Sequence, residues 1–320
     1  MPVFEMPLDQ LKVYQGRNPK PDGFDAFWDN SLKEMRAINE PVEFAAGEFQ
    51  TPFAACQDLF FTGVGGARIH AKVARPSKRA SKPRPAVLMF HGYSGSAGDW
   101  TSLLGYAAMG YTVAALDCRG QGGLSEDVGG VTGNTLHGHI IRGLDGPPDK
   151  LLFRQIFLDT AQLARIVMAM PDVDADRVGV TGGSQGGGLA LACAALEPRI
   201  KLAAPVYPFL CDYRRVWEMD LAKGAYQELD EYFRRFDPRH EREEQMWAKL
   251  GHIDVQHLCR RIRAKVLMGV GLMDQICPPS SQFAAYNKIQ SDKELAIYPD
   301  FGHENLPGHS DTIFKFLSEL

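Results

Sequence analysis

The sequence lacks paired cysteines, long apolar runs and an excess of basic charge. Its six cysteines are scattered without a C-x-x-C pair, so we expect reduced thiols rather than a disulfide framework. No stretch approaches the roughly 18 apolar residues that a membrane span needs, and acidic residues stand where a signal peptide would be apolar. The net charge of −4 argues against nucleic-acid binding. We therefore expect a protein that is cytoplasmic, or exported by a route that the sequence does not reveal, with neither a membrane nor a nucleic-acid partner.

Internal repeats and low-complexity tracts are also missing, and the composition is ordinary. The 320 residues are 45% apolar and 23% charged, which is typical of a globular protein. A chain of this length can bury a sizeable core without disulfides or metals. We expect a single domain over residues 1–320. Within it, the charged segment at approximately 211–257 has helix-spaced apolar residues, which predicts a helical insertion.

The first third of the sequence predicts a helix followed by a hairpin. Apolar residues at three- and four-residue steps in 21–39 indicate an amphipathic helix. Alternating segments at 57–63 and 67–74 flank Gly65-Gly66, which is typical of a β-hairpin. This part is expected to form an extension to the main body.

From residue 86 onward, short apolar runs alternate with helical patterns. The apolar runs occupy 86–90, 111–117, 177–182, 202–207, 265–270 and 294–298, and the helical patterns include 153–170, 187–196 and 281–289. This alternation predicts an α/β fold with a mostly parallel central sheet and helices on both faces. In such sheets, functional residues gather at the carboxyl ends of the strands.

The strongest local motif is Gly182-Gly183-Ser184-Gln185-Gly186, which fits G-x-S-x-G. It follows an apolar run and opens a helix of small residues, as a nucleophile elbow requires. The sharp reversal leaves no room for a Cβ at Gly182 or Gly186 and exposes the hydroxyl of Ser184. The alternative is a Gly-rich turn of a nucleotide-binding fold, but the G-x-G-x-x-G spacing is absent.

A serine nucleophile needs a base that a third group orients, in the chain order Ser, Asp or Glu, His. Asp274 follows the apolar run that ends near residue 271, and His303 follows the run 294–298. Both positions predict convergence on Ser184. The alternatives are a loop carboxylate that caps the next helix for Asp274, and a solvated loop histidine for His303.

The oxyanion of a tetrahedral intermediate needs aimed N–H donors. We expect one from the backbone of Gln185 and one from the backbone of Tyr93, in the loop after 86–90. The rings of Tyr93, Tyr207 and Phe209 are expected to line a shallow acyl pocket beside Ser184.

Two further polar groups suggest no cofactor chemistry. His137 and His139 lie near Asp127, but no third ligand has a recognisable metal-site spacing, so we expect neither a metal nor a cofactor. The segment Arg119-Gly120-Gln121 follows an apolar run, where an arginine can tie loops together by charge-assisted hydrogen bonds.

Together these motifs resemble the acetyl xylan esterase / cephalosporin C deacetylase family (carbohydrate esterase family 7) of the α/β-hydrolases, over nearly the whole chain. The matching segments are Met-Pro-Leu-Asp-Gln-Leu (6–11), Phe-Asp-Ala-Phe-Trp (24–28), His-Gly-Tyr (91–93), Arg-Gly-Gln (119–121), Gly-Gly-Ser-Gln-Gly (182–186), Pro-Phe-Leu-Cys-Asp-Tyr (208–213) and Tyr-Pro-Asp-Phe-Gly-His-Glu (298–304).

The resemblance implies roles for five residues: Ser184 as nucleophile, Asp274 as acid, His303 as base, and Tyr93 and Gln185 as oxyanion donors. It also implies removal of acetyl groups from xylo-oligosaccharides and from small esters such as cephalosporin C. Family members of this kind form doughnut-shaped hexamers whose active sites face an inner cavity, so a homo-hexamer is expected.

Two other functions compete with this interpretation. An inactive hydrolase scaffold that serves as a binding protein would be expected to have lost a triad or oxyanion position, and none is missing. A serine peptidase or a longer-chain carboxylesterase on the same fold is the alternative enzyme. A peptidase of this size would need a gating domain, and no repeat array is visible.

Overall fold

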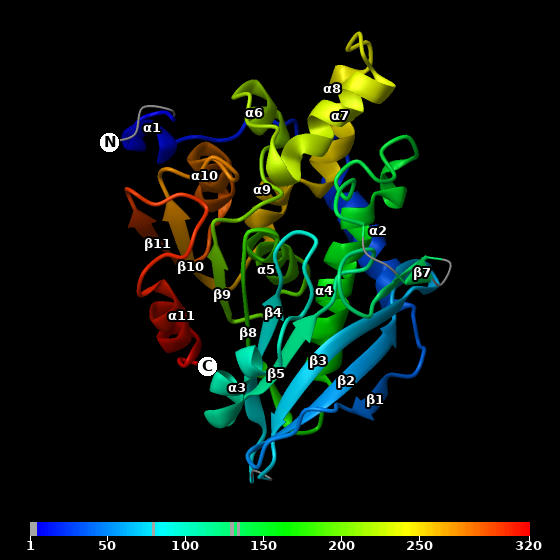
Figure 1. The fold of residues 1–320 in the computed structure, drawn as a ribbon, viewed down its shortest axis with the longest axis vertical. Helices are drawn as coiled ribbons and strands as arrows, with labels where there is room; N and C mark the ends of the chain where they lie inside the picture. Colours follow the sequence, from blue (N-terminus) through cyan, green and yellow to red (C-terminus); the bar gives the residue numbers. More distant parts are fainter. Residues whose placement is uncertain (1–4, 79–80, 129–130, 133–134) are drawn as a thin grey trace.

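A twisted sheet of nine strands runs through the computed structural model, which describes residues 5–320 apart from 79–80, 129–130 and 133–134 (Figure 1). In the described residues its strand order is β1-β2-β3-β5-β4-β8-β9-β10-β11. The strands are β1 (Glu43–Ala46), β2 (Ala54–Thr62), β3 (Arg68–Pro76), β4 (Arg84–Phe90), β5 (Thr112–Leu116), β8 (Val173–Gly183), β9 (Leu202–Val206), β10 (Lys265–Gly271) and β11 (Lys293–Tyr298).

The six strands from β5 to β11 in this order are parallel, whereas β1, β2 and β3 form an antiparallel extension. The register pairs Phe90 of β4 with Gly182 of β8, and Gly183 with Val206 of β9. The loops that follow β4, β8 and β9 therefore leave the sheet side by side. This sheet confirms the mostly parallel architecture that the sequence predicts.

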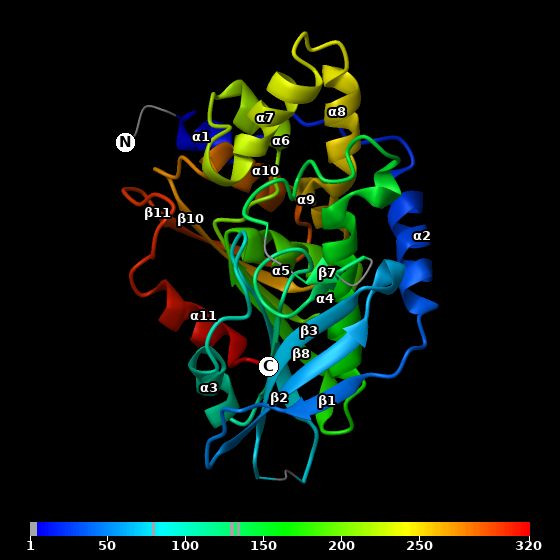
Figure 2. The ribbon, with the colours of Figure 1, turned by 45° about the vertical axis from the view of Figure 1, so that its right-hand side comes forward.

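Helices cover both faces of the sheet (Figures 1 and 2). One face packs against α2 (Phe24–Arg36), α4 (Leu152–Met168) and α5 (Gln185–Leu196). Helices α3 (Thr101–Ala108) and α11 (His309–Leu317) cover the other face with a smaller apolar cluster. All residues of α5 are buried, which explains why this helix consists almost entirely of small and apolar residues.

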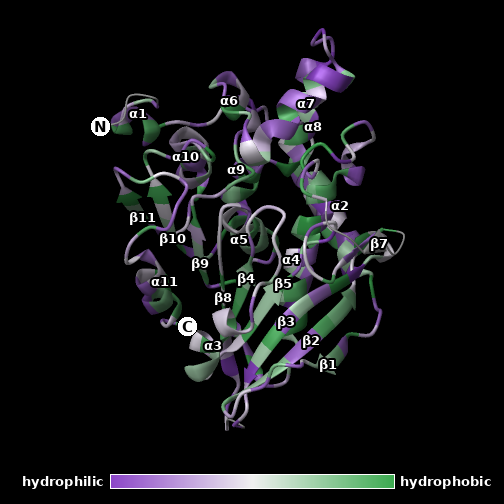
Figure 3. Ribbon diagram, viewed as in Figure 1, coloured by the Kyte–Doolittle hydropathy of each residue, from purple (hydrophilic) through white to green (hydrophobic). Residues whose placement is uncertain are grey.

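The segment between β9 and β10 is helical and lies beyond the carboxyl edge of the sheet (Figure 1). Figure 3 shows that its outer helices carry many hydrophilic residues, whereas the central strands are hydrophobic. It comprises α6 (Tyr213–Glu218), α7 (Gln227–Phe236), α8 (Glu243–Leu250) and α9 (Val255–Leu258). The buried faces of these helices pack on the main core through residues such as Leu229, Phe233 and Trp247.

The remaining elements are short. They are helices α1 (Leu8–Leu11) and α10 (Pro279–Lys288), the paired strands β6 (Glu126–Asp127) and β7 (Val131–Thr132), and the 3₁₀ turns Val64–Gly66, Pro148–Lys150, Gly224–Tyr226, Gly251–Ile253 and Cys259–Arg261. In the part of the chain that the structure describes, no helix is long and apolar enough to cross a membrane.

The structure confirms the helix expected in 21–39, the hairpin, the six apolar strands and the helices expected at 153–170, 187–196 and 281–289. It adds β1 and α3, which the sequence analysis did not single out. Residues 129–130 and 133–134 of the long segment 120–150 lie outside the described residues.

Candidate active site

Ser184 occupies the turn between β8 and α5, with a backbone φ of 57° and ψ of −121°. This region is unfavourable for an L side chain, so the surrounding structure must hold it. A Cβ on Gly186 would lie 2.0 Å from the carbonyl oxygen of Phe90, and one on Gly182 would lie 2.6 Å from the carbonyl of Gly186. Glycine at both positions therefore allows the close approach of strands and helix that forms the elbow.

The structure brings Ser184, His303 and Asp274 together in one hydrogen-bonded chain. His303 Nε2 lies 2.9 Å from Ser184 Oγ, and His303 Nδ1 lies 2.8 Å from Asp274 Oδ2. Because the carboxylate can only accept, Nδ1 carries the imidazole proton and Nε2 accepts from the serine hydroxyl. This is the arrangement in which an imidazole can remove the proton of a serine nucleophile.

Asp274 is fixed by its own loop and by α10. It is fully buried, and its Oδ1 accepts from the backbone N–H groups of Ile276 (2.9 Å) and Cys277 (2.8 Å). The amide of Gln282 donates to Oδ2 at 3.2 Å. The carboxylate therefore cannot rotate freely, and it holds the ring of His303 in one orientation.

Glutamine side chains connect the two expected oxyanion donors. The side-chain amides of Gln121 and Gln185 are reciprocally hydrogen-bonded at 2.9 Å in both directions. The oxygen of Gln121 also accepts from the backbone N–H of Ser94 at 2.9 Å, next to Tyr93. The loop after β4 is thereby fastened to the start of α5. The donor roles of the Tyr93 and Gln185 N–H groups stay predictions.

Arg119 has the structural role that its position suggested. It is fully buried and donates from Nε and Nη2 to the two oxygens of Asp159 at 2.8 and 2.7 Å. It also donates to the carbonyl of Val64 at 2.8 Å. Burial raises the pKa of Asp159, and the guanidinium opposes that effect. Arg119 therefore ties the end of β5 to α4 and to the hairpin turn.

Tyr93 meets a buried carboxylate that sequence reasoning missed. Its hydroxyl donates to Oε1 of Glu228 on α7, and Glu228 Oε2 accepts from the backbone N–H groups of Ile140 (2.7 Å) and Ile141 (2.9 Å). Burial raises the pKa of Glu228 to about 7. Nothing in the charged sequence around Glu228 distinguished it from a solvent-facing helix residue.

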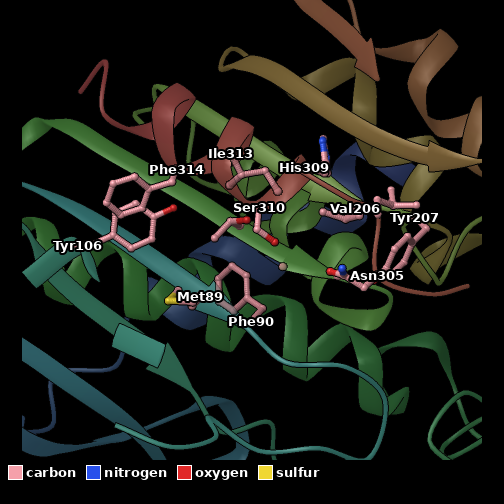
Figure 4. A pocket seen from close by; sticks show the side chains of 14 residues that line it. Met89, Phe90, Tyr106, Val206, Tyr207, Asn305, His309, Ser310, Ile313 and Phe314 are labelled. Atoms are coloured by element: carbon pink, nitrogen blue, oxygen red, sulfur yellow. The ribbon is translucent and has the colours of Figure 1, made fainter. Parts of the chain in front are cut away.

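Tyr207 lies against the triad, at one end of an apolar cavity of about 440 Å³. Its ring centroid is 4.6 Å from that of His303, and its backbone φ of 31° is positive. Figure 4 shows Tyr106 and Phe314 at the opposite end of this cavity. Phe209 has no exposed surface and packs against Tyr93 at 5.5 Å between ring centroids. Phe209 is one of the three rings expected to line the acyl pocket. Because it has no exposed surface, it supports the ring of Tyr93 and does not itself face a pocket.

One group of described residues has metal-ligand character: Asp274, Cys277 and His303, whose ligand atoms lie within 4.8 Å of one another. Asp274 and His303 are already bonded to each other. Burial raises the pKa of the Cys277 thiol well above its ordinary value, while the hydroxyl of Ser184 beside it lowers it. The chemistry of this group therefore fits a proton-transfer site better than a cation site.

The two histidines of the long segment lie around the ring of Tyr93. His139 Nε2 lies 3.1 Å from Ser94 Oγ, and burial lowers the pKa of His139 to about 4. The ring centroids of His137 and His139 are 6.5 and 4.9 Å from that of Tyr93. Asp127 instead forms an ion pair with Arg142. These residues stabilise the loop beside the site and do not converge on a common point.

The sheet order, the helices on both faces and the strained elbow define the α/β-hydrolase fold. The family model of the acetyl xylan esterases (AXE1) matches residues 1–320. The chain belongs to this acetyl xylan esterase family, and its homologues indicate a carboxylic ester hydrolase.

Two solved structures are similar over almost their full length. Acetyl xylan esterase 1 from Thermoanaerobacterium sp. JW/SL YS485 is 60% identical, with a TM-score of 0.95 and coverage of 98% of this chain and 99% of that chain. The acetyl xylan esterase from Paenibacillus sp. R4 is 38% identical, with a TM-score of 0.91 and the same coverage. Acetyl esterase Axe7A of Xylanibacter ruminicola is 26% identical over 90% of this chain. The chain spans 64% of the length of that relative.

Proposed function

We propose that the protein is a serine esterase that removes acetyl groups from acetylated xylo-oligosaccharides and from small acetyl esters such as cephalosporin C. The observation that carries this proposal is the 2.9 Å contact between Ser184 Oγ and His303 Nε2 at the strained elbow. The proposal is also supported by membership of the acetyl xylan esterase family and by the two similar solved structures, both of which are acetyl xylan esterases.

The first half-reaction forms an acetyl-enzyme. His303 Nε2 accepts the proton of Ser184 as Oγ attacks the acetyl carbonyl carbon, and the carbonyl oxygen becomes an oxyanion. The backbone N–H groups of Tyr93 and Gln185 stabilise this charge. The carbon–oxygen bond to the sugar then breaks, and the departing alkoxide takes the proton from the imidazolium. Asp274 stabilises that imidazolium through Nδ1.

The second half-reaction releases acetate. A water molecule gives a proton to His303 Nε2 as its oxygen attacks the acetyl carbonyl, which forms a second oxyanion in the same position. The bond to Ser184 Oγ breaks, and the serine takes the proton back. The products are acetic acid, which ionises to acetate, and the free enzyme.

Acetate release across a substrate panel tests this proposal. We expect release from acetylated xylo-oligosaccharides, cephalosporin C and nitrophenyl acetate, and no cleavage of a peptide nitroanilide. The peptide substrate is the matched probe for the peptidase alternative. Cleavage of the peptide without release of acetate from any ester would overturn the esterase proposal.

We also propose a homo-hexamer whose active sites face an inner cavity. The support is the edge strand β1, whose four residues are all exposed and include Phe44 at 43% exposure; Phe49 (37%) and Phe53 (44%) lie in the segment that connects β1 to β2. Exposed edge strands with apolar side chains are rarely left uncovered.

A cytoplasmic location is proposed as well, because all six cysteines are free thiols, which is typical of a reducing compartment.

A further inference from the structure

Glu228 is a buried carboxylate near the proposed catalytic centre, with three hydrogen-bond donors around it. Glu228 is 1% exposed, and it is the second residue of α7. In the described residues, no Lys, Arg or His forms an ion pair with it. A buried carboxylate without a cation is costly, and hydrogen bonds offset that cost only in part. Stability alone therefore does not account for a glutamate here.

Three segments that are distant in the sequence meet at this carboxylate. Glu228 belongs to the helical segment between β9 and β10, Tyr93 to the loop after β4, and Ile140 and Ile141 to the long segment after β5. One oxygen binds the Tyr93 hydroxyl, and the other binds both backbone N–H groups. The carboxylate therefore links α7 to the loop of Tyr93 and to the long segment.

Two aromatic rings pack against the half-buried ring of Tyr93, and a hydrogen bond anchors its hydroxyl. Phe209 packs at 5.5 Å and His139 at 4.9 Å between ring centroids, both edge-on. These contacts restrict the ring laterally, whereas the hydroxyl bond to Glu228 fixes its far end. Because the ring and the backbone N–H belong to the same residue, an anchored ring restricts the direction of that N–H.

We propose that Glu228 is a positioning residue that holds Tyr93 so that its backbone N–H stays aimed at the substrate's carbonyl oxygen. Glu228 itself does not touch the reacting atoms. This inference rests on the proposed function, because it assigns the Tyr93 N–H to the oxyanion hole. A misplacement of about 1 Å at such a donor can cost about a hundredfold in rate.

Two variants change the contact, one from each side. Tyr93→Phe removes the hydroxyl and keeps the ring and the backbone N–H, and Glu228→Gln keeps an acceptor for Ile140 and Ile141 but removes the charge. The matched control is Tyr14→Phe, which removes another tyrosine–carboxylate hydrogen bond, from Tyr14 to Asp212 at 2.8 Å, outside the contacts of the triad. Thermal unfolding of each variant shows whether it folds.

The readouts are kcat and KM for nitrophenyl acetate and the inhibition constant of a methyl trifluoromethyl ketone, whose serine adduct carries an oxyanion. We expect Tyr93→Phe to lower kcat about ten- to a hundredfold, with KM within about twofold of wild type. The ketone should lose affinity by a similar factor. Glu228→Gln should give a smaller loss of the same kind, and Tyr14→Phe should leave kcat and the ketone affinity unchanged.

A folded Tyr93→Phe variant with wild-type kcat and ketone affinity overturns the proposal for Glu228. Equal losses in Tyr93→Phe and Tyr14→Phe do the same, because they indicate a general loss of stability. The proposed function has a separate test, because a folded Ser184→Ala variant that keeps its activity would contradict the esterase proposal and not the role of Glu228. If Glu228→Gln does not fold, Tyr93→Phe alone decides the question.

Discussion

At the scale of single residues, Tyr207 lines the apolar cavity and lies against His303 of the proposed triad. Its ring lies over Gly183, where an added Cβ would meet it at 3.4 Å, and it contacts the ring of His303. We expect a long acyl chain to displace this ring when it enters the cavity. Overpacking of this kind costs about 1–3 kcal/mol, which is about ten- to a hundredfold in rate.

We therefore expect kcat/KM to fall from nitrophenyl acetate to butyrate to octanoate, and Tyr207→Ala to raise the octanoate rate relative to acetate. Tyr106→Ala is the control, because it enlarges the far end of the cavity and leaves the Tyr207 ring in place. Steady-state kinetics with the three esters measures both effects. A wild-type preference for octanoate would refute the small acyl pocket.

The buried Glu228 also makes stability depend on pH. Because burial raises its pKa from 4.5 to about 7, the folded state binds more protons than the unfolded state between these values. The contribution of Glu228 to the free energy of unfolding therefore decreases as pH rises through this window, and it is constant above it. We expect wild type to lose about 1–3 kcal/mol relative to Glu228→Gln from pH 4.5 to pH 7. Urea unfolding at several pH values checks this, and a constant difference between the two proteins would contradict it.

At the scale of elements, the elbow depends on the close approach of β4, β8 and α5. Gly186→Ala would place a Cβ 2.0 Å from the backbone oxygen of Phe90, which no side-chain movement can relieve. We expect it to destabilise the protein by about 3 kcal/mol or more. Gly105→Ala in α3 is the matched control, because its Cβ would meet only Phe314 at 3.4 Å. In a helix this change is neutral or stabilising by up to about 1 kcal/mol. Calorimetry that finds equal melting temperatures for both variants would be incompatible with this account of the elbow.

The elements around Ser184, Asp274 and His303 were predictable because each residue follows an apolar run at the end of a parallel strand, although β11 before His303 is only partly buried and begins with Lys293 and Glu294. Because parallel strands end at the same edge of the sheet, three motifs far apart in the sequence predicted one common site at that edge. Two other elements carried no such signal. The four residues of β1 are exposed, and they pair only because β2 offers a free edge. The helix α3 is short and has weak apolar periodicity.

Glu228 was unpredictable for a different reason. Its partners Tyr93 and Ile140 lie 135 and 88 residues away in the sequence, and no local pattern links them. Only the packing of α7 against two loops buries this carboxylate. Sequence periodicity identifies the face of a helix that is buried, whereas it does not identify the polar group that two distant loops will enclose.

At the scale of the whole molecule, the exposed strand β1 and the helix α1 lie on opposite sides (Figure 1). We expect Phe44→Asp on β1 to shift the proposed hexamer toward smaller species, because it puts a charge on an exposed apolar edge. Val13→Asp, next to α1, changes a side chain that is 71% exposed on the other side and serves as the control. Light scattering at micromolar concentration measures both. A wild-type protein that is a stable monomer would contradict the hexamer.

The prediction of a single domain over residues 1–320 also belongs to this scale and stays a prediction. Two apolar clusters lie on the two faces of one sheet, and the helices between β9 and β10 join the larger cluster. Because these helices also supply Glu228, the body and the helical segment both contribute to the surroundings of Ser184.

The most direct test of the account is the turnover of Ser184→Ala with nitrophenyl acetate and with an acetylated xylo-oligosaccharide. The variant removes only the hydroxyl that lies 2.9 Å from His303 Nε2, so circular dichroism should show an unchanged fold. We predict that kcat falls about 10⁴- to 10⁶-fold on both substrates. A folded Ser184→Ala variant that releases acetate at the wild-type rate would contradict the central claim that Ser184 is the nucleophile.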